Sequence, residues 1–190
     1  RRRGRGRDEA TSDACRQQKC RVAKEYDPQT TPVVSARPQH RQLRPSFDNV
    51  TDWDRQELLK LDLNGNCIKR VRTPYYGPNG IEVANGYVFV THYYHHRIAV
   101  YNTSNLGFVT SKYTGSTDIY YPQGIDVNAA GNILAIANDY SHKVTFWNLS
   151  GGSIGSKITT LGSSASSANG SFNRPYDVNF DSNGNIFVSD

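Results

Sequence analysis

Hydrophobic and polar residues alternate along residues 121–147 in a pattern that predicts three consecutive short strands. Ile125 and Val127 are separated by a polar residue, which is the period of a half-buried strand. Residues 133–137 form a short, nearly continuous apolar run, as expected of a strand that is buried on both faces. After a polar, turn-like segment, residues 144–147 resume a β-rich pattern. We therefore predict one supersecondary unit of short strands.

The same unit recurs along the chain. Clear copies cover residues 76–101 and 173–190, and a fainter copy covers residues 49–65. A repeat of about 40–50 residues that is built from short strands predicts the blades of a β-propeller. Equivalent polar residues, spaced 40 to 52 residues apart, close the middle strand of each copy; they are Asp52, His92, Asn138 and Asp190.

Each copy carries short sequence motifs in phase with the predicted strands. The motif residues are Pro78, Gly80, Ile81, Val83, His96, Arg97 and Ile98 in one copy, Pro122, Gly124, Ile125, Val127, Gly131, Asn132, Ile133, His142, Lys143 and Val144 in the next, and Gly184, Asn185, Ile186, Val188 and Asp190 in the last. They resemble the NHL-repeat family, whose pattern is roughly P-x-G-I-x-V, then G-N-I-y-V-a-D, then x-x-N-H-r-I-x-V-f. His92 and Asn138 depart from the usual acid, and Asp177 replaces a glycine. The resemblance covers residues 49–190 and implies an all-β fold of four-stranded NHL-like blades, six of them in a complete ring.

Charge divides the chain into two regions. In residues 1–45, Lys and Arg outnumber Asp and Glu by 7, whereas in residues 46–190 the acidic residues are in excess by 2. A segment as polar as the first region buries too little apolar surface to offset the entropy of ordering, so we predict a basic disordered tail or linker over residues 1–45. A strand of the first blade at residues 31–34 is the alternative for part of it. Residues 46–190 are predicted to be a propeller fragment with two complete and two partial blades, truncated within the last one.

The tyrosines are concentrated in the predicted loops. In a propeller, the loops that lead into the first strand of each blade share a face with the loops that join its second and third strands. Eight of the 12 tyrosines map to these loops, with His and Arg side chains among them. Such groups are typical of recognition surfaces, although aromatic residues also fill the gaps between packed elements. The predicted partner-binding residues are Tyr75, Tyr76, Tyr93, Tyr94, His95, Tyr120, Tyr121, Tyr140, Arg174 and Tyr176.

Histidines and cysteines give little support to metal binding or catalysis. The three cysteines are too few and too irregularly spaced for a disulfide scaffold. The HYYHH segment at residues 92–96 spans a strand end and a turn, whereas zinc motifs of this spacing use a helix. His96 and His142 are expected to be structural, with rings that satisfy turn carbonyls. We predict no catalytic residue, no metal ligand and no cofactor.

A metal-dependent propeller enzyme is the competing interpretation. Asp52, Asn138 and Asp190 offer oxygen ligands of the hardness that calcium prefers. The resemblance would then imply a lactonase-like hydrolase or a peptidyl-amidating lyase with a metal in the central channel. These same residues also belong to the ordinary strand-end signature of the repeats.

The sequence therefore predicts a non-catalytic interaction scaffold that binds a protein or RNA partner through its tyrosine-rich loops. A protein is the favoured partner, and RNA binding would be aided by the basic segment Arg1–Arg7. Resemblance to tripartite-motif NHL proteins implies the substrate-recognition part of a ubiquitin ligase. No apolar run approaches the roughly 18 residues of a membrane span, so no membrane partner is predicted. A cytoplasmic location is favoured over secretion, which would suit the glycosylation sequons at Asn49, Asn102, Asn148 and Asn169.

Overall fold

The computed structural model describes residues 47–190, so the predictions made for residues 1–45, for the strand at 31–34 and for Arg1–Arg7 lie outside the described residues. The described part is built from strands and one short 3-10 helix, which confirms the predicted all-β fold. The elements are β1 (Phe47–Asp52), β2 (Glu57–Asp62), β3 (Cys67–Arg72), β4 (Pro78–Ala84), β5 (Tyr87–His92), η1 (Tyr93–His95), β6 (Arg97–Asn102), β7 (Phe108–Tyr113), β8 (Pro122–Val127), β9 (Ile133–Asn138), β10 (Lys143–Ser150), β11 (Ser153–Leu161), β12 (Asp177–Phe180) and β13 (Ile186–Ser189).

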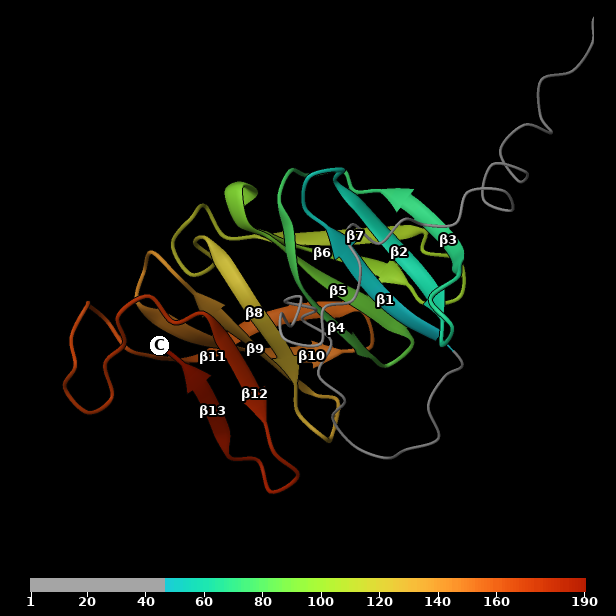
Figure 1. Cartoon of the computed structure of the whole chain (residues 1–190). Helices are drawn as coiled ribbons and strands as arrows, with labels where there is room; N and C mark the ends of the chain where they lie inside the picture. Colours follow the sequence, from blue (N-terminus) through green and yellow to red (C-terminus); the bar gives the residue numbers. More distant parts are fainter. Residues whose placement is uncertain (1–46) are drawn as a thin grey trace, which may run out of the picture.

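The strands form four antiparallel sheets that follow one another in chain order, from cyan to red in Figure 1. Strands β4 to β7 and β8 to β11 make two four-stranded meanders, β1 to β3 make a three-stranded sheet, and β12 pairs with β13. The innermost strand β8 contacts both β4 and β12, so neighbouring sheets pack against one another through their first strands. This arrangement is a partial β-propeller.

The middle strands β5 and β9 are buried on both faces because each lies between two neighbouring sheets. In β5, Val88 and Val90 pack in a core with Leu58 of the preceding sheet, whereas Phe89 packs in a core with Leu134 and Ile136 of the following sheet. Strand β9 repeats this alternation toward the next sheet. A strand with two apolar faces reads as a continuous apolar run, which is the pattern seen in the sequence.

Glycines in the first strands let adjacent sheets approach closely. A Cβ atom added at Gly80 would lie 2.3 Å from the carbonyl oxygen of Gln123 in the next first strand. A Cβ atom added at Gly124 would lie 2.6 Å from the Cα atom of Asp177. Because both approaches are shorter than a van der Waals contact, any side chain at these glycines would push the sheets apart.

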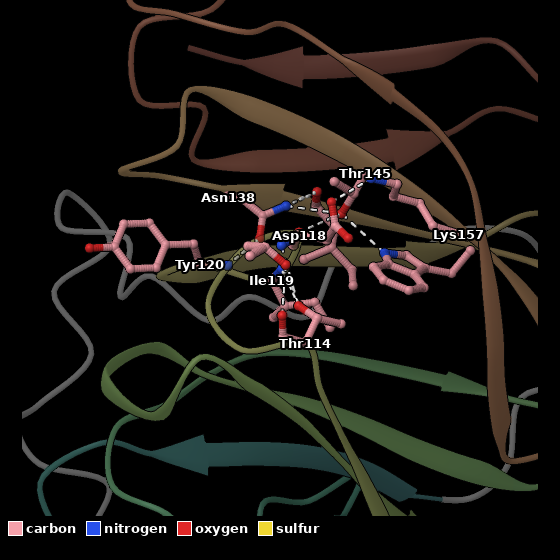
Figure 2. A network of polar contacts seen from close by, with 10 residues as sticks. Thr114, Asp118, Ile119, Tyr120, Asn138, Thr145 and Lys157 are labelled. Carbon is pink, nitrogen blue, oxygen red and sulfur yellow. Dashed lines mark hydrogen bonds and ion pairs between the residues drawn. The ribbon is translucent and has the colours of Figure 1, made fainter.

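The loop that precedes β8 is tied to the end of β9 through Asn138 (Figure 2). The Asn138 Oδ1 accepts a hydrogen bond from the backbone N–H of Tyr120 at 2.9 Å, and its Nδ2 donates to the Thr145 hydroxyl at 3.0 Å. Within the loop, the Thr114 hydroxyl accepts the backbone N–H of Ile119 at 3.0 Å. Figure 2 shows the ring of Tyr120 pointing away from this network. The polar contacts therefore hold the loop backbone and leave the ring to its aromatic neighbours.

The first strands also carry a carboxyl pair where β4 packs on β8. The Asp126 side chain accepts the backbone N–H groups of Val127 at 2.9 Å and of Phe180 at 2.6 Å, so it links β8 to β12. Glu82 of β4 shares a hydrogen bond with Asp126. Burial, together with the nearby Asp126 carboxylate, raises the pKa of Glu82 to about 8, and burial also raises the pKa of Asp126. The pair therefore holds a proton at neutral pH.

Candidate functional site

The loops at one end of the sheets bring most of the predicted tyrosines into one continuous group of rings. Trp53, just after β1, has its ring centroid 5.8 Å from that of Tyr93 and 5.5 Å from that of Tyr94. Tyr121, just before β8, lies 4.8 Å from Tyr93 and 4.5 Å from Tyr140. We name this group the aromatic face, and its rings are Trp53, Tyr76, Tyr93, Tyr94, His96, Tyr120, Tyr121 and Tyr140.

The aromatic face has a packed inner layer and an exposed outer layer. Tyr93 and Tyr121 are half-buried and each contacts several other rings. In contrast, Tyr76, Tyr94 and Tyr140 are 40%, 51% and 50% exposed. Tyr76 and Tyr94 stack on each other, with centroids 5.5 Å apart and an interplanar angle of 23°. The inner rings thus hold the outer rings in fixed positions at the surface.

The other predicted residues lie beside this face rather than in it. Tyr75 is half-buried, its hydroxyl lies 3.0 Å from the Ser111 hydroxyl, and the Arg97 guanidinium lies over its ring. His95 is exposed and packs on Tyr75. Tyr176 is 54% exposed and stands just before β12. Partner binding by these residues and by the aromatic face stays a prediction.

Asp139 anchors the aromatic face, although no sequence pattern marked it as a site residue. The side chain of Asp139 is almost fully buried and accepts two hydrogen bonds from the Arg174 guanidinium, at 2.6 and 3.0 Å. It also accepts the Tyr93 hydroxyl at 2.9 Å and the Gln123 amide at 3.3 Å. The Arg174 guanidinium in turn lies over the Tyr140 ring, 4.5 Å from its centroid.

These contacts determine the protonation state of the Asp139 side chain. Burial by itself would raise the pKa of Asp139, but the hydrogen bonds from Arg174, Tyr93 and Gln123 together hold that pKa below its usual value. Burial and the hydrogen bond to Asp139 raise the pKa of the Tyr93 hydroxyl. At neutral pH Asp139 is therefore a carboxylate, and it accepts hydrogen bonds from Tyr93, Gln123 and Arg174, which lie in three separate segments of the chain.

Two histidines connect their own sheets to the loop that leads into the next sheet. The Nδ1 of His96 accepts the backbone N–H of Tyr121 at 3.0 Å, and the Nδ1 of His142 accepts the backbone N–H of Arg174 at 3.1 Å. Both histidines have a left-handed backbone, with φ of 52° and 55°. The expectation that these rings satisfy turn carbonyls is wrong, because each Nδ1 accepts a hydrogen bond from a backbone N–H group in the loop that leads into the next sheet. These contacts nevertheless give His96 and His142 a structural role.

His92 differs in its contacts from Asn138 and Asp190, which close the second strands of the later sheets. It is fully buried at the end of β5, and neither ring nitrogen makes a hydrogen bond. The backbone N–H of Tyr76 donates instead to Nδ1 of His95, at 3.1 Å. Burial lowers the pKa of His92 to about 4, an effect that the nearby backbone of Tyr76 and Tyr75 only partly opposes. The ring is therefore neutral at physiological pH and packs edge-on against Tyr75.

The described part of the chain was also compared with the metal site that the enzyme alternative would need. Across residues 47–190, no three His, Cys, Asp or Glu side chains are grouped closely enough to hold a metal ion. Of the three strand-end oxygens considered in the sequence, that of Asn138 caps Tyr120, that of Asp190 accepts the Asn173 N–H at 2.6 Å, and that of Asp52 pairs with Arg55. No helix among these residues is long and apolar enough to cross a membrane.

Comparison with known proteins supports the fold assignment. No family model matches the chain, and no curated protein matches it. Among solved structures it is similar to a hydrazine synthase of Kuenenia stuttgartiensis, at a TM-score of 0.57 and 18% identity over 75% of this chain and 40% of that one. It is similar to the dihydro-heme d1 dehydrogenase NirN, at a TM-score of 0.56 and 16% identity over 81% of this chain and 32% of that one. A chain of the mitotic checkpoint complex gives a TM-score of 0.60 and 8% identity over 76% of this chain and 42% of that one.

At these identities the likeness shows the fold alone. This chain spans 32% to 42% of the length of the three structures. Together with the four successive sheets, the comparisons place the chain in the class of β-propellers.

Proposed function

We propose that this propeller is a non-catalytic interaction scaffold that binds a protein partner through the aromatic face. The observation that carries the proposal is the exposed outer layer of Tyr76, Tyr94 and Tyr140 on a packed aromatic base. Exposed tyrosines that are held in place lose little conformational freedom on binding, and each offers a large apolar surface with a polar tip. Such residues are typical hot spots of protein interfaces.

The charges on this face favour a protein over RNA. The Arg174 guanidinium is engaged by Asp139, and Arg55 is paired with Asp52 at 3.2 Å. Residues 46–190 as a whole carry two more acidic than basic residues. Binding to a phosphate backbone needs cations that are free to replace counterions, and the guanidinium groups of Arg174 and Arg55 are already paired with carboxylates. The slight negative charge suits a protein surface of neutral or positive charge.

The finer assignment to the NHL type belongs to the same proposal. The P-x-G motif is supported by the close approach of first strands at Gly80 and Gly124. The histidine that precedes each third strand is supported by the inter-sheet hydrogen bonds of His96 and His142. In a tripartite-motif ubiquitin ligase, a propeller of this type would select the substrate, and the aromatic face is the surface that we assign to that task.

The test compares exposed side chains inside the face with one outside it. Full-length chain carrying Tyr94→Ala and Tyr140→Ala together is used beside the wild type to capture partners for quantitative mass spectrometry, and the dissociation constant of a purified partner is then measured. We expect the double variant to weaken binding by about tenfold or more, as hot-spot truncations do. The control is Leu63→Ala, because Leu63 is 62% exposed in the turn after β2, at the opposite end of the first sheet from Trp53. Equal loss of binding in the control, or none in the double variant, would overturn the proposal.

A separate measurement addresses RNA. We expect a short single-stranded RNA to bind the full chain weakly, through Arg1–Arg7, so that deletion of this segment removes binding and flattens its salt dependence. RNA binding that survives the deletion but is lost in Tyr94→Ala would instead make RNA the ligand of the aromatic face.

A further inference from the structure

A cavity of about 560 Å³ opens beside the aromatic face, at the same end of the sheets. It lies between the starts of the first strands β4, β8 and β12 and the ends of β1 and β13. Trp53 belongs both to its wall and to the aromatic face, and the exposed Tyr176 stands at another part of the wall. The cavity therefore adjoins the aromatic face, shares a ring with it, and extends the surface that a partner would contact.

The exposed rings of this surface carry hydrogen-bond donors that the protein does not use. Among residues 47–190, the hydroxyl groups of Tyr94 and Tyr140 and the indole N–H of Trp53 make no hydrogen bond. The carboxylates beside them are already engaged, because Asp139 accepts hydrogen bonds from side chains of the protein and Asp52 pairs with an arginine at 3.2 Å. The surface therefore matches an uncharged ligand that has many acceptors and few donors.

Three other modes of peptide recognition suit this surface less well. Addition of a β-strand needs a sheet edge, whereas the rings of the aromatic face stand in loops between strands. An amphipathic helix needs an apolar groove, whereas Asn49, Thr51 and Gln123 contribute polar groups to the cavity wall. A phosphorylated segment needs free arginines, whereas Arg174 and Arg55 are paired with carboxylates. The remaining mode is the docking of a proline-rich segment on an aromatic surface.

Asn49 adds one requirement to the ligand. This residue lines the cavity and is only 7% exposed, and none of the described residues donates a hydrogen bond to its Oδ1. A buried acceptor without a donor is rare in proteins, so it points to a ligand that brings an N–H group. Proline has no backbone N–H, so the ligand must carry other residues between its prolines.

We propose that a proline-rich segment of the partner docks as a polyproline II helix across the aromatic face and into the cavity, an inference that rests on the function proposed above. In this helix every third residue lies on the same edge, so the prolines of a Pro-x-x-Pro segment turn their rings toward one surface. Those rings pack on the exposed aromatic rings, the peptide carbonyls accept the hydroxyls of Tyr94 and Tyr140, and an N–H between the prolines pairs with Asn49. Because both the helix and the tyrosines are ordered before binding, little conformational entropy is lost.

The probe is the peptide acetyl-Pro-Ala-Ala-Pro-Ala-Ala-Pro-amide, whose binding to the full chain is followed by calorimetry and by tryptophan fluorescence. The chain has two tryptophans, and Trp147 is only 3% exposed, so a fluorescence change on binding reports Trp53. The matched control peptide carries glycine in place of each proline, which keeps the charge and the N–H groups but removes the rings and the preformed helix.

We expect saturable binding of the proline peptide with a change in the fluorescence of Trp53, and at least about tenfold weaker binding of the glycine peptide. Similar binding of the two peptides would overturn the proposal. Calorimetric binding that leaves the fluorescence unchanged would place the peptide away from Trp53 and would also overturn it.

Two substitutions place the binding on this surface. Tyr94→Ala removes an exposed ring of the aromatic face, Tyr176→Ala removes a ring of the cavity wall, and each should weaken the proline peptide by about tenfold. Leu63→Ala, at the opposite end of the first sheet, is the control and should leave the dissociation constant unchanged. Because Tyr94 and Tyr176 are 51% and 54% exposed, their truncation should preserve the fold. Unchanged binding in both tyrosine variants would refute the assignment.

Competition from the prolines of the chain itself is removed in a second form of the full chain. Four of the eight prolines precede the described residues, and in this form they are changed to serine; they are Pro28, Pro32, Pro38 and Pro45. Failure of the proline peptide to bind either form would overturn the inference.

The partner-capture experiment separates this inference from the proposed function. If captured proteins depend on Tyr94 and Tyr140 while neither form of the chain binds the proline peptide, the aromatic face binds a protein but not through a polyproline II helix. If the proline peptide binds and is weakened by Tyr94→Ala and Tyr176→Ala, the inference holds.

Discussion

The side-chain oxygen of Asn138 accepts the backbone N–H of Tyr120 at 2.9 Å, and this contact joins the end of a second strand to the loop that leads into its own sheet. Asp190 makes the equivalent contact with Asn173 at 2.6 Å. In the sheet of β4 to β7, His92 holds this position and makes no such contact. Asn138 and Asp190 therefore show which side chains can make this contact, and they indicate an asparagine as the replacement for His92.

We predict that His92→Asn stabilises the protein. The substitution removes two buried ring nitrogens without partners, and the asparagine Oδ1 can accept the Tyr76 N–H, which otherwise donates to the exposed His95 ring. The expected gain in the free energy of unfolding is about 1 kcal/mol, measured by urea denaturation. The reverse change, Asn138→His, should cost about 2 kcal/mol because it removes the contacts to Tyr120 and Thr145. A lower stability of His92→Asn would show that packing against Tyr75 matters more than hydrogen bonding.

Acidification should destabilise the protein through His92. Its pKa is about 4 in the folded chain and about 6.5 in the unfolded chain, so between these values the unfolded state binds more protons. Stability from the neutral ring is present above about pH 6.5, falls as the pH is lowered, and levels off below about pH 4. The loss is on the order of 3 kcal/mol. Comparing the wild type with His92→Asn at about pH 7 and about pH 4.5 isolates this part of the pH dependence, and parallel curves would contradict it.

Alkaline conditions should act through Glu82. Its pKa is raised to about 8, above the unfolded value of about 4.5, so the folded state holds the proton more tightly. The stability linked to protonated Glu82 is complete below about pH 4.5 and is lost as the pH rises through about 8. Glu82→Gln, which keeps a neutral group of similar size, should remove this loss. The difference in unfolding free energy between variant and wild type should therefore grow between about pH 5 and about pH 9, and a constant difference would count against the assignment.

Neighbouring tyrosines of the aromatic face should differ in their effect on stability. Tyr93 is half-buried, packs between Trp53 and Tyr121, and donates its hydroxyl to Asp139. Tyr93→Ala should cost about 3 kcal/mol by thermal or urea denaturation, because it leaves a cavity among the rings and removes one of the hydrogen bonds to Asp139. Tyr94 is 51% exposed, and Tyr94→Ala should cost less than about 1 kcal/mol. Equal costs for the two variants would mean that both tyrosines serve the packing of the sheets.

The order and phase of the strands follow from the amino-acid pattern alone. Alternation at Ile125 and Val127 and the apolar run at 133–137 mark β8 and β9, and the strand ends at His92 and Asn138 lie where the repeat places them. These features depend on neighbours a few residues apart and on the two-residue period of a strand, which one chain segment carries alone.

Which of these residues come into contact depends on how the sheets pack together. Asp139 and Arg174 are 35 residues apart and come together because one sheet packs beside the next. The same packing exposes Tyr94, half-buries Tyr93 and leaves a cavity beside Asn49, although nothing in the local sequence separates the two tyrosines. Contacts between sheets depend on the angle and distance at which the first strands approach, and these are set jointly by every residue in the interface.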